Sequence, residues 1–137
     1  MQSDNSLNKQ AQKLDQLLKS QVVYDYMLSL AGVTANFAAC LDPYRFKRAE
    51  YDKTRPEVQN KTKEDILKLQ ESEKKELVQM LRASPLLQQV ALMNLSVACG
   101  KHIPSSKLKE NLSKPILIAK RQYGGFSNRI CADLIRQ

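Results

Sequence analysis

The sequence is poor in the residues and motifs that are typical of enzymes. Its 137 residues include one histidine, three cysteines and four glycines. None of the motifs G-x-S-x-G, H-E-x-x-H and G-x-x-x-x-G-K-S/T occurs, so no nucleophile elbow, zinc-protease helix or phosphate-binding loop is indicated. The single histidine, His102, lies in the segment GKHIPSS after a glycine that we expect to end a helix, where it should face solvent. We therefore expect no catalytic residue, no metal site and no cofactor.

Long apolar runs and a leader-like N-terminus are also missing. No stretch of about 18 or more apolar residues occurs, and the first residues, MQSDNSLNKQ, lack the charged-then-apolar layout of a signal peptide. We therefore expect a soluble, cytoplasmic protein without a membrane partner. Cys40, Cys99 and Cys131 are widely spaced, odd in number and surrounded by apolar residues, which predicts unpaired, buried, structural cysteines in a reducing compartment.

What the sequence does contain is the apolar periodicity of α-helices. A chain of 137 residues with 42% hydrophobic residues can fill one core, so we expect a single domain. Over residues 4–31, apolar side chains recur at three- and four-residue steps, and the spacing resumes at Val33 until Asp42-Pro43 ends it. This N-terminal helical arm, residues 1–43, is predicted to be either one long helix or two.

Capping residues predict further helices in the central part of the chain, residues 64–100. Thr62 followed by Asp65 resembles a capping box and predicts a helix from about residue 63. Ser84-Pro85 predicts a second start, and Gly100 predicts its end. The segment between them is apolar enough that we expect it to be the central, mostly buried helix. Its expected inward side consists of Leu87, Val90, Ala91, Asn94 and Val97.

The C-terminal tail, residues 101–137, is broken by Pro104, Pro115 and Gly124-Gly125 into short predicted helices. The N-caps predicted for them are Ser106, Ser113 and Ser127. The predicted fold is therefore all-α: a single-domain helical bundle of five to seven helices with a basic connector and a broken basic C-terminal tail. We expect at least about 60% helix and no sheet of three or more strands.

Charge is distributed unevenly along the chain, whose net charge is +8. The N-terminal arm, residues 1–43, and the central helices, residues 64–100, each have a net charge of −1. The basic connector, residues 44–63, has +4 and the basic short helices of the tail, residues 101–137, have +6. A nearly neutral scaffold with separate basic surfaces suits the sugar-phosphate backbone of nucleic acid, because each neutralised phosphate releases counterions.

The basic connector combines cations with aromatic rings in the stretch LDPYRFKRAEYDKTRPE. Tyr44 and Phe46 offer flat faces on which an unpaired base could stack. The candidate phosphate ligands are Arg45, Lys47, Arg48, Lys53 and Arg55. In an extended chain Tyr44, Phe46 and Arg48 would share a side, whereas in a helix Tyr44, Lys47, Arg48 and Tyr51 would do so. The alternative is that the rings fill a gap in the core while the cations reach into water.

The tail supplies a second set of candidate nucleic-acid ligands. They are Lys107, Lys109, Lys114, Lys120, Arg121 and Arg129, with Tyr123 as a candidate stacking residue. Only Glu110 and Asp133 oppose this charge, although the ordinary exposed faces of short helices would give a similar pattern.

The size, helicity and basic surface favour a non-catalytic nucleic-acid-binding protein. In these three respects the chain resembles the small helical subunits that line the nucleic acid in CRISPR effector complexes. The resemblance implies a subunit of a ribonucleoprotein or nucleoprotein complex that contacts the backbone of single-stranded RNA or DNA and other protein subunits, with self-association left open. The competing hypothesis is a protein–protein adaptor or scaffold subunit, whose amphipathic helices and basic segments would meet an acidic partner surface.

Overall fold

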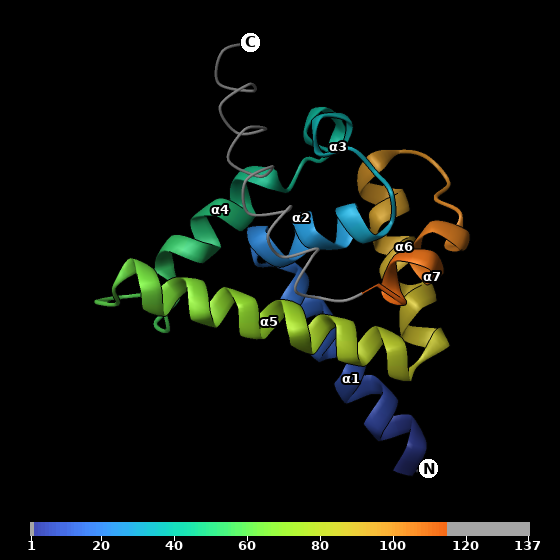
Figure 1. The fold of residues 1–137 in the computed structure, drawn as a ribbon, viewed down its shortest axis with the longest axis horizontal. Helices are drawn as coiled ribbons and strands as arrows, with labels where there is room; N and C mark the ends of the chain where they lie inside the picture. Colours follow the sequence, from blue (N-terminus) through green and yellow to red (C-terminus); the bar gives the residue numbers. More distant parts are fainter. Residues whose placement is uncertain (1, 115–137) are drawn as a thin grey trace.

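Seven α-helices make up residues 2–114, which is the part of the chain that the computed structural model describes (Figure 1). They are α1 (Gln2–Leu18), α2 (Gln21–Leu30), α3 (Ala35–Leu41), α4 (Arg45–Thr54), α5 (Lys63–Ala83), α6 (Pro85–Cys99) and α7 (Ser105–Leu112). With 77% helix in a single compact domain and no strand among the described residues, the predicted all-α bundle of five to seven helices is confirmed. Within residues 2–114, none of the helices combines the length and the apolar character needed to span a bilayer.

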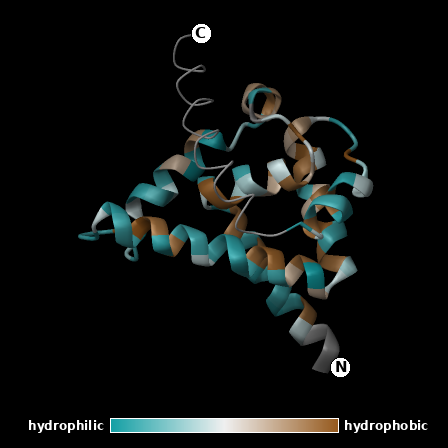
Figure 2. Cartoon of the chain, viewed as in Figure 1, coloured by the Kyte–Doolittle hydropathy of each residue, from teal (hydrophilic) through white to brown (hydrophobic). Residues whose placement is uncertain are grey.

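The central helix of the fold is α2. It contacts α1, α3, α4, α5 and α7. Its buried residues are Val23, Tyr24, Tyr26, Met27, Leu28 and Leu30. In Figure 1 it runs through the middle of the molecule, with α5 below it, α3 above it and α4 to its left. Figure 2 shows hydrophobic residues along α2 and mostly hydrophilic ones along α4.

Apolar residues lie on both sides of α6, but only one side of the helix is buried. The prediction that residues 85–99 form the central, mostly buried helix is therefore wrong. Its buried residues are Leu87, Ala91, Leu92, Leu95 and Cys99. By contrast, Leu86, Met93 and Val97 are 47%, 67% and 83% exposed. Asn94 and Val97, both predicted to face inward, are exposed. When nearly every position of a helix is apolar, the periodicity cannot distinguish the buried side from the exposed one.

The predicted helix boundaries around α5 and α6 are confirmed. The Thr62 hydroxyl accepts the Asp65 N–H (3.2 Å), and the Ser84 hydroxyl accepts the Leu87 N–H (3.2 Å). Gly100 ends α6 with a φ of +65°, a left-handed conformation that glycine adopts at little cost. Each of these interactions joins residues that are close in sequence, which is why the sequence alone predicts them.

The start of α7 differs from the prediction. This helix begins at Ser105, directly after Pro104, so Ser106 lies inside it rather than at its N-cap. The fixed φ of proline holds Pro104 in an extended conformation and ends the preceding loop there. Ser113 is the C-cap of α7. The helix that Ser113 was expected to start lies outside the described residues, as does Ser127.

The N-terminal arm is broken into three helices rather than one or two. Between α1 and α2, Ser20 is extended (φ −69°, ψ 129°) and fully buried. The new N-terminus of α2 is stabilised by Asp52 of α4, whose Oδ2 accepts the Gln21 N–H (2.9 Å). Because Asp52 is 31 positions away, local periodicity does not reveal this break. The end of α3 before Asp42-Pro43 is as predicted.

Two cysteines lie in the described part of the chain. Both Cys40 and Cys99 are free, as predicted. Cys99 is completely buried, but Cys40 is exposed, so its predicted burial is wrong. It belongs to the short helix α3, in which, over residues 36–41, only Ala38 is fully covered by the rest of the fold. Cys131 lies outside the described residues.

Candidate nucleic-acid interface

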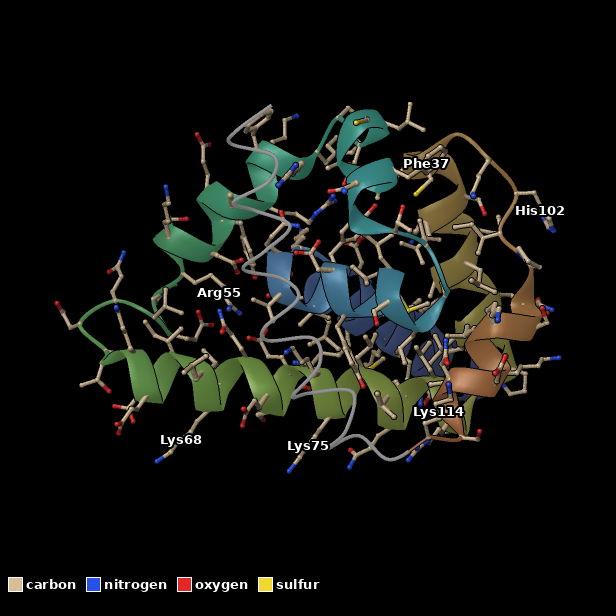
Figure 3. The ribbon with its side chains drawn as sticks, turned by 45° about the horizontal axis from the view of Figure 1, so that its top comes forward. Phe37, Arg55, Lys68, Lys75, His102 and Lys114 are labelled. Carbon is tan, nitrogen blue, oxygen red and sulfur yellow. The ribbon has the colours of Figure 1, made fainter. Side chains whose placement is uncertain are left out.

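Helix α4 docks on the rest of the fold through a stripe of charged side chains. Arg48, Asp52 and Arg55 are spaced four and three residues apart, which places them on one side of the helix. Asp52 binds the N-terminus of α2, and Arg55 forms a bidentate ion pair with Glu73 of α5 (Nη1–Oε2 2.8 Å, Nη2–Oε1 3.0 Å). Figure 3 shows Arg55 between α4 and α5. Arg55, one of the candidate phosphate ligands, is therefore buried and already paired with acidic groups of the fold.

Arg48 is also buried, but in different surroundings. Its guanidinium lies over the Tyr24 ring, with Cζ 3.4 Å from the ring centroid, and pairs with the Asp42 carboxylate. Asp42 also accepts the Tyr44 N–H (2.9 Å), so the residue that follows α3 orients the start of α4. Burial raises the pKa of Tyr24 to about 12. The Tyr24 hydroxyl and Arg48 Nε are buried without a hydrogen-bond partner among the described residues.

A groove of about 650 Å³ lies between the last turn of α1, one side of α4 and the C-terminal half of α6. Its lining residues are Asp15, Leu18, Lys19, Tyr24, Pro43, Tyr44, Lys47, Arg48, Tyr51, Asn94, Val97 and Ala98. The contribution of α4 is the set Tyr44, Lys47, Arg48 and Tyr51, which confirms the helical alternative for the basic connector. The volume falls within the usual range for sites that bind small molecules or single residues of a polymer.

Tyrosine rings and cations give the groove its chemical character. Tyr44 is 54% exposed, and Lys47 Nζ lies 5.2 Å from the centroid of its ring. Tyr51 is partly exposed, and its hydroxyl accepts a hydrogen bond from the Gln16 amide of α1. The lining contains two exposed lysines against the single carboxylate of Asp15, while the charge of the buried Arg48 is balanced by Asp42, so the exposed part of the lining has a net charge of +1. The groove is therefore a cationic surface with exposed aromatic faces.

The other candidates from the basic connector lie outside the groove. Phe46 is 81% exposed, Lys53 is exposed and Arg45 is partly buried. The exposure of Phe46 and Tyr44 is inconsistent with the alternative in which both rings fill the core. The first half of residues 44–63 is thus the helix α4, which buries Arg48 and is followed by the buried Arg55, while Tyr44 and Phe46 are exposed.

The tail candidates lie far from the groove or outside the described residues. Lys107 and Lys109 are exposed on α7, and Lys114 is exposed just after it. In Figure 1, α7 and α4 lie on opposite sides of the molecule, and Figure 3 shows Lys114 on the α7 side. The structure therefore does not bring these two basic surfaces together. Lys120, Arg121, Tyr123 and Arg129 lie outside the described residues.

Most residues of the groove were missed from the sequence, among them Lys19, Tyr24 and Asn94. Tyr24 belongs to the most buried helix, so its pattern is that of a core residue. Lys19 follows α1 and resembles any exposed lysine at a helix end. Asn94 did give a signal, because it interrupts an otherwise apolar segment, but the helix face was assigned incorrectly.

The described residues form no metal site, and the comparisons with known proteins give no relative. In the part of the chain that the structure describes, no three His, Cys, Asp or Glu side chains are placed to hold a metal ion. His102 is exposed and points outward from the loop between α6 and α7 (Figure 3). Comparisons with protein-family models, with curated proteins and with solved structures gave no match.

Proposed function

We propose that the protein binds single-stranded RNA or DNA through the groove between α1, α4 and α6, as a non-catalytic subunit of a larger nucleoprotein complex. The observation that carries this proposal is that one groove contains the exposed Tyr44 ring, the partly exposed Tyr51 ring and two exposed lysines. A stacked base contributes about 1–3 kcal/mol of affinity in such sites, whatever its identity. Rings and cations that line the same groove can therefore bind bases and phosphates of the same strand.

The charge of the groove fits the phosphate backbone. Lys19 and Lys47 are exposed, so their ammonium groups can approach phosphates without a large desolvation cost. The partner of Lys19 within the fold is Asp15, at 3.9 Å and on the surface, and such a pair is weak enough to be exchanged for a phosphate. The net charge of +8 for the whole chain also favours association with a polyanion.

A single strand fits the site better than a duplex does. In a duplex the base faces are stacked on one another and are inaccessible to tyrosine rings, whereas unpaired bases can be splayed out onto them. Direct reading of duplex DNA commonly uses a protruding helix or β-ribbon that enters the major groove. Here the rings line a concave surface between three helices, so we expect duplex to bind more weakly than either single strand.

A titration with matched charge variants tests the proposal. The variant Lys19→Ala with Lys47→Ala removes both lysines of the groove. The control, Lys68→Ala with Lys75→Ala, removes two lysines that point away from the body along the outer side of α5 (Figure 3). Both variants have the same net charge, so any difference between them comes from position.

We expect the groove variant to bind single-stranded RNA and DNA more weakly than the control does. Its log–log salt dependence should be flatter by roughly 1.4, since each phosphate contact to a single strand contributes about 0.7. Equal affinities and equal salt slopes for the two variants would remove the groove from consideration. If the unmodified protein binds none of these nucleic acids at low salt, the proposed function is wrong.

An adaptor is the second candidate function, because α6 and α3 expose apolar side chains. Met93 and Val97 are exposed by 67% and 83%, and Phe37 and Leu41 by 41% and 48%. Exposed apolar residues of this size often form contacts with another protein. Lack of binding to any oligonucleotide at low salt would favour this candidate.

A further inference from the structure

We infer that the groove accepts one unstacked adenine of the bound strand and recognises its edge through the side-chain amide of Asn94. This inference rests on the proposed function and adds base preference to it. Backbone contacts alone would make binding independent of sequence. A side chain that reads the edge of a base would create a preference at one position of the strand.

Asn94 is unusual in its position on α6. It is exposed on the side of the helix that lines the groove, one turn before Val97 and Ala98. Among the lining residues it supplies the only carboxamide. A carboxamide presents one acceptor and one donor group side by side, so it can form two hydrogen bonds to a base edge at once.

The chemistry of a carboxamide favours adenine. Asn pairs with adenine by accepting from N6–H and donating to N7, and this edge is free in an unpaired base. Stacking points the same way, because the two-ring purine covers more of a tyrosine face than a pyrimidine does. Tyr44 and Tyr51 of α4 offer such faces, while Val97 and Ala98 give the α6 side an apolar surface.

The cations of the groove complete the site for a nucleotide that belongs to a strand. Lys19 and Lys47 are exposed and can contact the phosphates on either side of the accepted base. Arg48 is 9% exposed and its charge is balanced by Asp42, so the two lysines are the cations of the groove that can reach a phosphate. The volume of about 650 Å³ is sufficient for one nucleotide.

The experiment compares oligouridylates of about ten nucleotides, the order of a single-strand site, that contain one central adenine, guanine, cytosine or uracil. Fluorescence anisotropy gives the dissociation constant of each strand. We expect the strand with adenine to bind about tenfold more tightly than the all-uracil strand. In Asn94→Ala the strand with adenine should bind no more tightly than the strand with guanine, so that only the advantage that stacking gives to either purine remains. Gln89→Ala is the control, because Gln89 is an exposed amide of the same helix that is not part of the lining.

The possible outcomes separate this inference from the proposed function. If the strands with adenine and guanine bind equally, or if Asn94→Ala still binds adenine more tightly than guanine, the inference is wrong and the proposed function stands. If no strand binds, both are wrong. Adenosine monophosphate is titrated in parallel. Binding of the free nucleotide without binding of any strand would overturn both and indicate a site for a free nucleotide.

Discussion

Replacement of Arg55 tests the finding that α4 is held in place by its charged stripe. The Arg55 side chain is 8% exposed, and the carboxylate of its partner Glu73 belongs to a side chain that is 12% exposed. Asp52 Oδ1 lies 3.5 Å from the same guanidinium. In Arg55→Ala, two carboxylates would stay close together in a poorly solvated place without a cation. We therefore expect a loss of about 3–5 kcal/mol in the free energy of unfolding, as for other buried pairs from which one partner is removed.

The measurement is urea denaturation followed by circular dichroism at pH 7. The double variant Arg55→Met with Glu73→Leu should recover part of the loss, because it removes the Glu73 carboxylate as well, while Asp52 keeps the hydrogen bond from the Gln21 N–H. Lys13→Ala serves as the control, since Lys13 pairs with Glu76 at 3.5 Å and both side chains are about half exposed. We expect that change to cost less than about 1 kcal/mol. A similarly small loss for Arg55→Ala would refute the reasoning and make Arg55 available to a ligand again.

Three further predictions concern stability and binding. Burial raises the pKa of Asp25 to about 6, so the folded state loses stability as pH rises from about 4 to 6. In urea titrations, Asp25→Asn should therefore raise the free energy of unfolding by about 1–2 kcal/mol at pH 7 and hardly at all at pH 4, and an equal effect at both pH values would contradict this. Gly100→Ala should lower the free energy of unfolding by about 1 kcal/mol, because of the φ of +65° at this position. Gly32→Ala should lower it further, because an added Cβ would lie 3.1 Å from Lys107 Cγ, and equal thermal unfolding midpoints for the two variants would count against this. Tyr44→Ala should weaken single-strand affinity by about 1–3 kcal/mol with little change in the free energy of unfolding, whereas a large loss of stability would assign this ring to the core.

The helix boundaries that the sequence predicts correctly depend on local chemistry. The hydroxyls of Thr62 and Ser84 bond to N–H groups three residues later, and Gly100 adopts a left-handed conformation next to the helix that it ends. Each of these can be recognised in a window of a few residues. The break at Ser20 cannot, since the N-terminus that it creates is capped by Asp52 from a distant helix.

The candidate site was predictable only in part, because counting charges does not show which of them are paired. The sequence pointed to the correct helix, and the helical alternative placed Tyr44, Lys47 and Tyr51 on one side of it. It did not show that Arg55 is paired with Glu73, which lies 18 residues away in the sequence. The sequence also did not show which side of α6 lines the groove, because that depends on how the whole bundle packs.

The most direct test of the central claim is to locate the bound strand on the protein. Amide resonances of the ¹⁵N-labelled protein would be followed during titration with a single-stranded oligonucleotide. We expect the largest shifts at groove residues such as Lys47, Tyr51 and Val97, with little change along the outer side of α5 around Lys68 and Lys75. Shifts that are confined to Lys107–Lys114, or the absence of shifts at a saturating concentration of strand, would contradict the account.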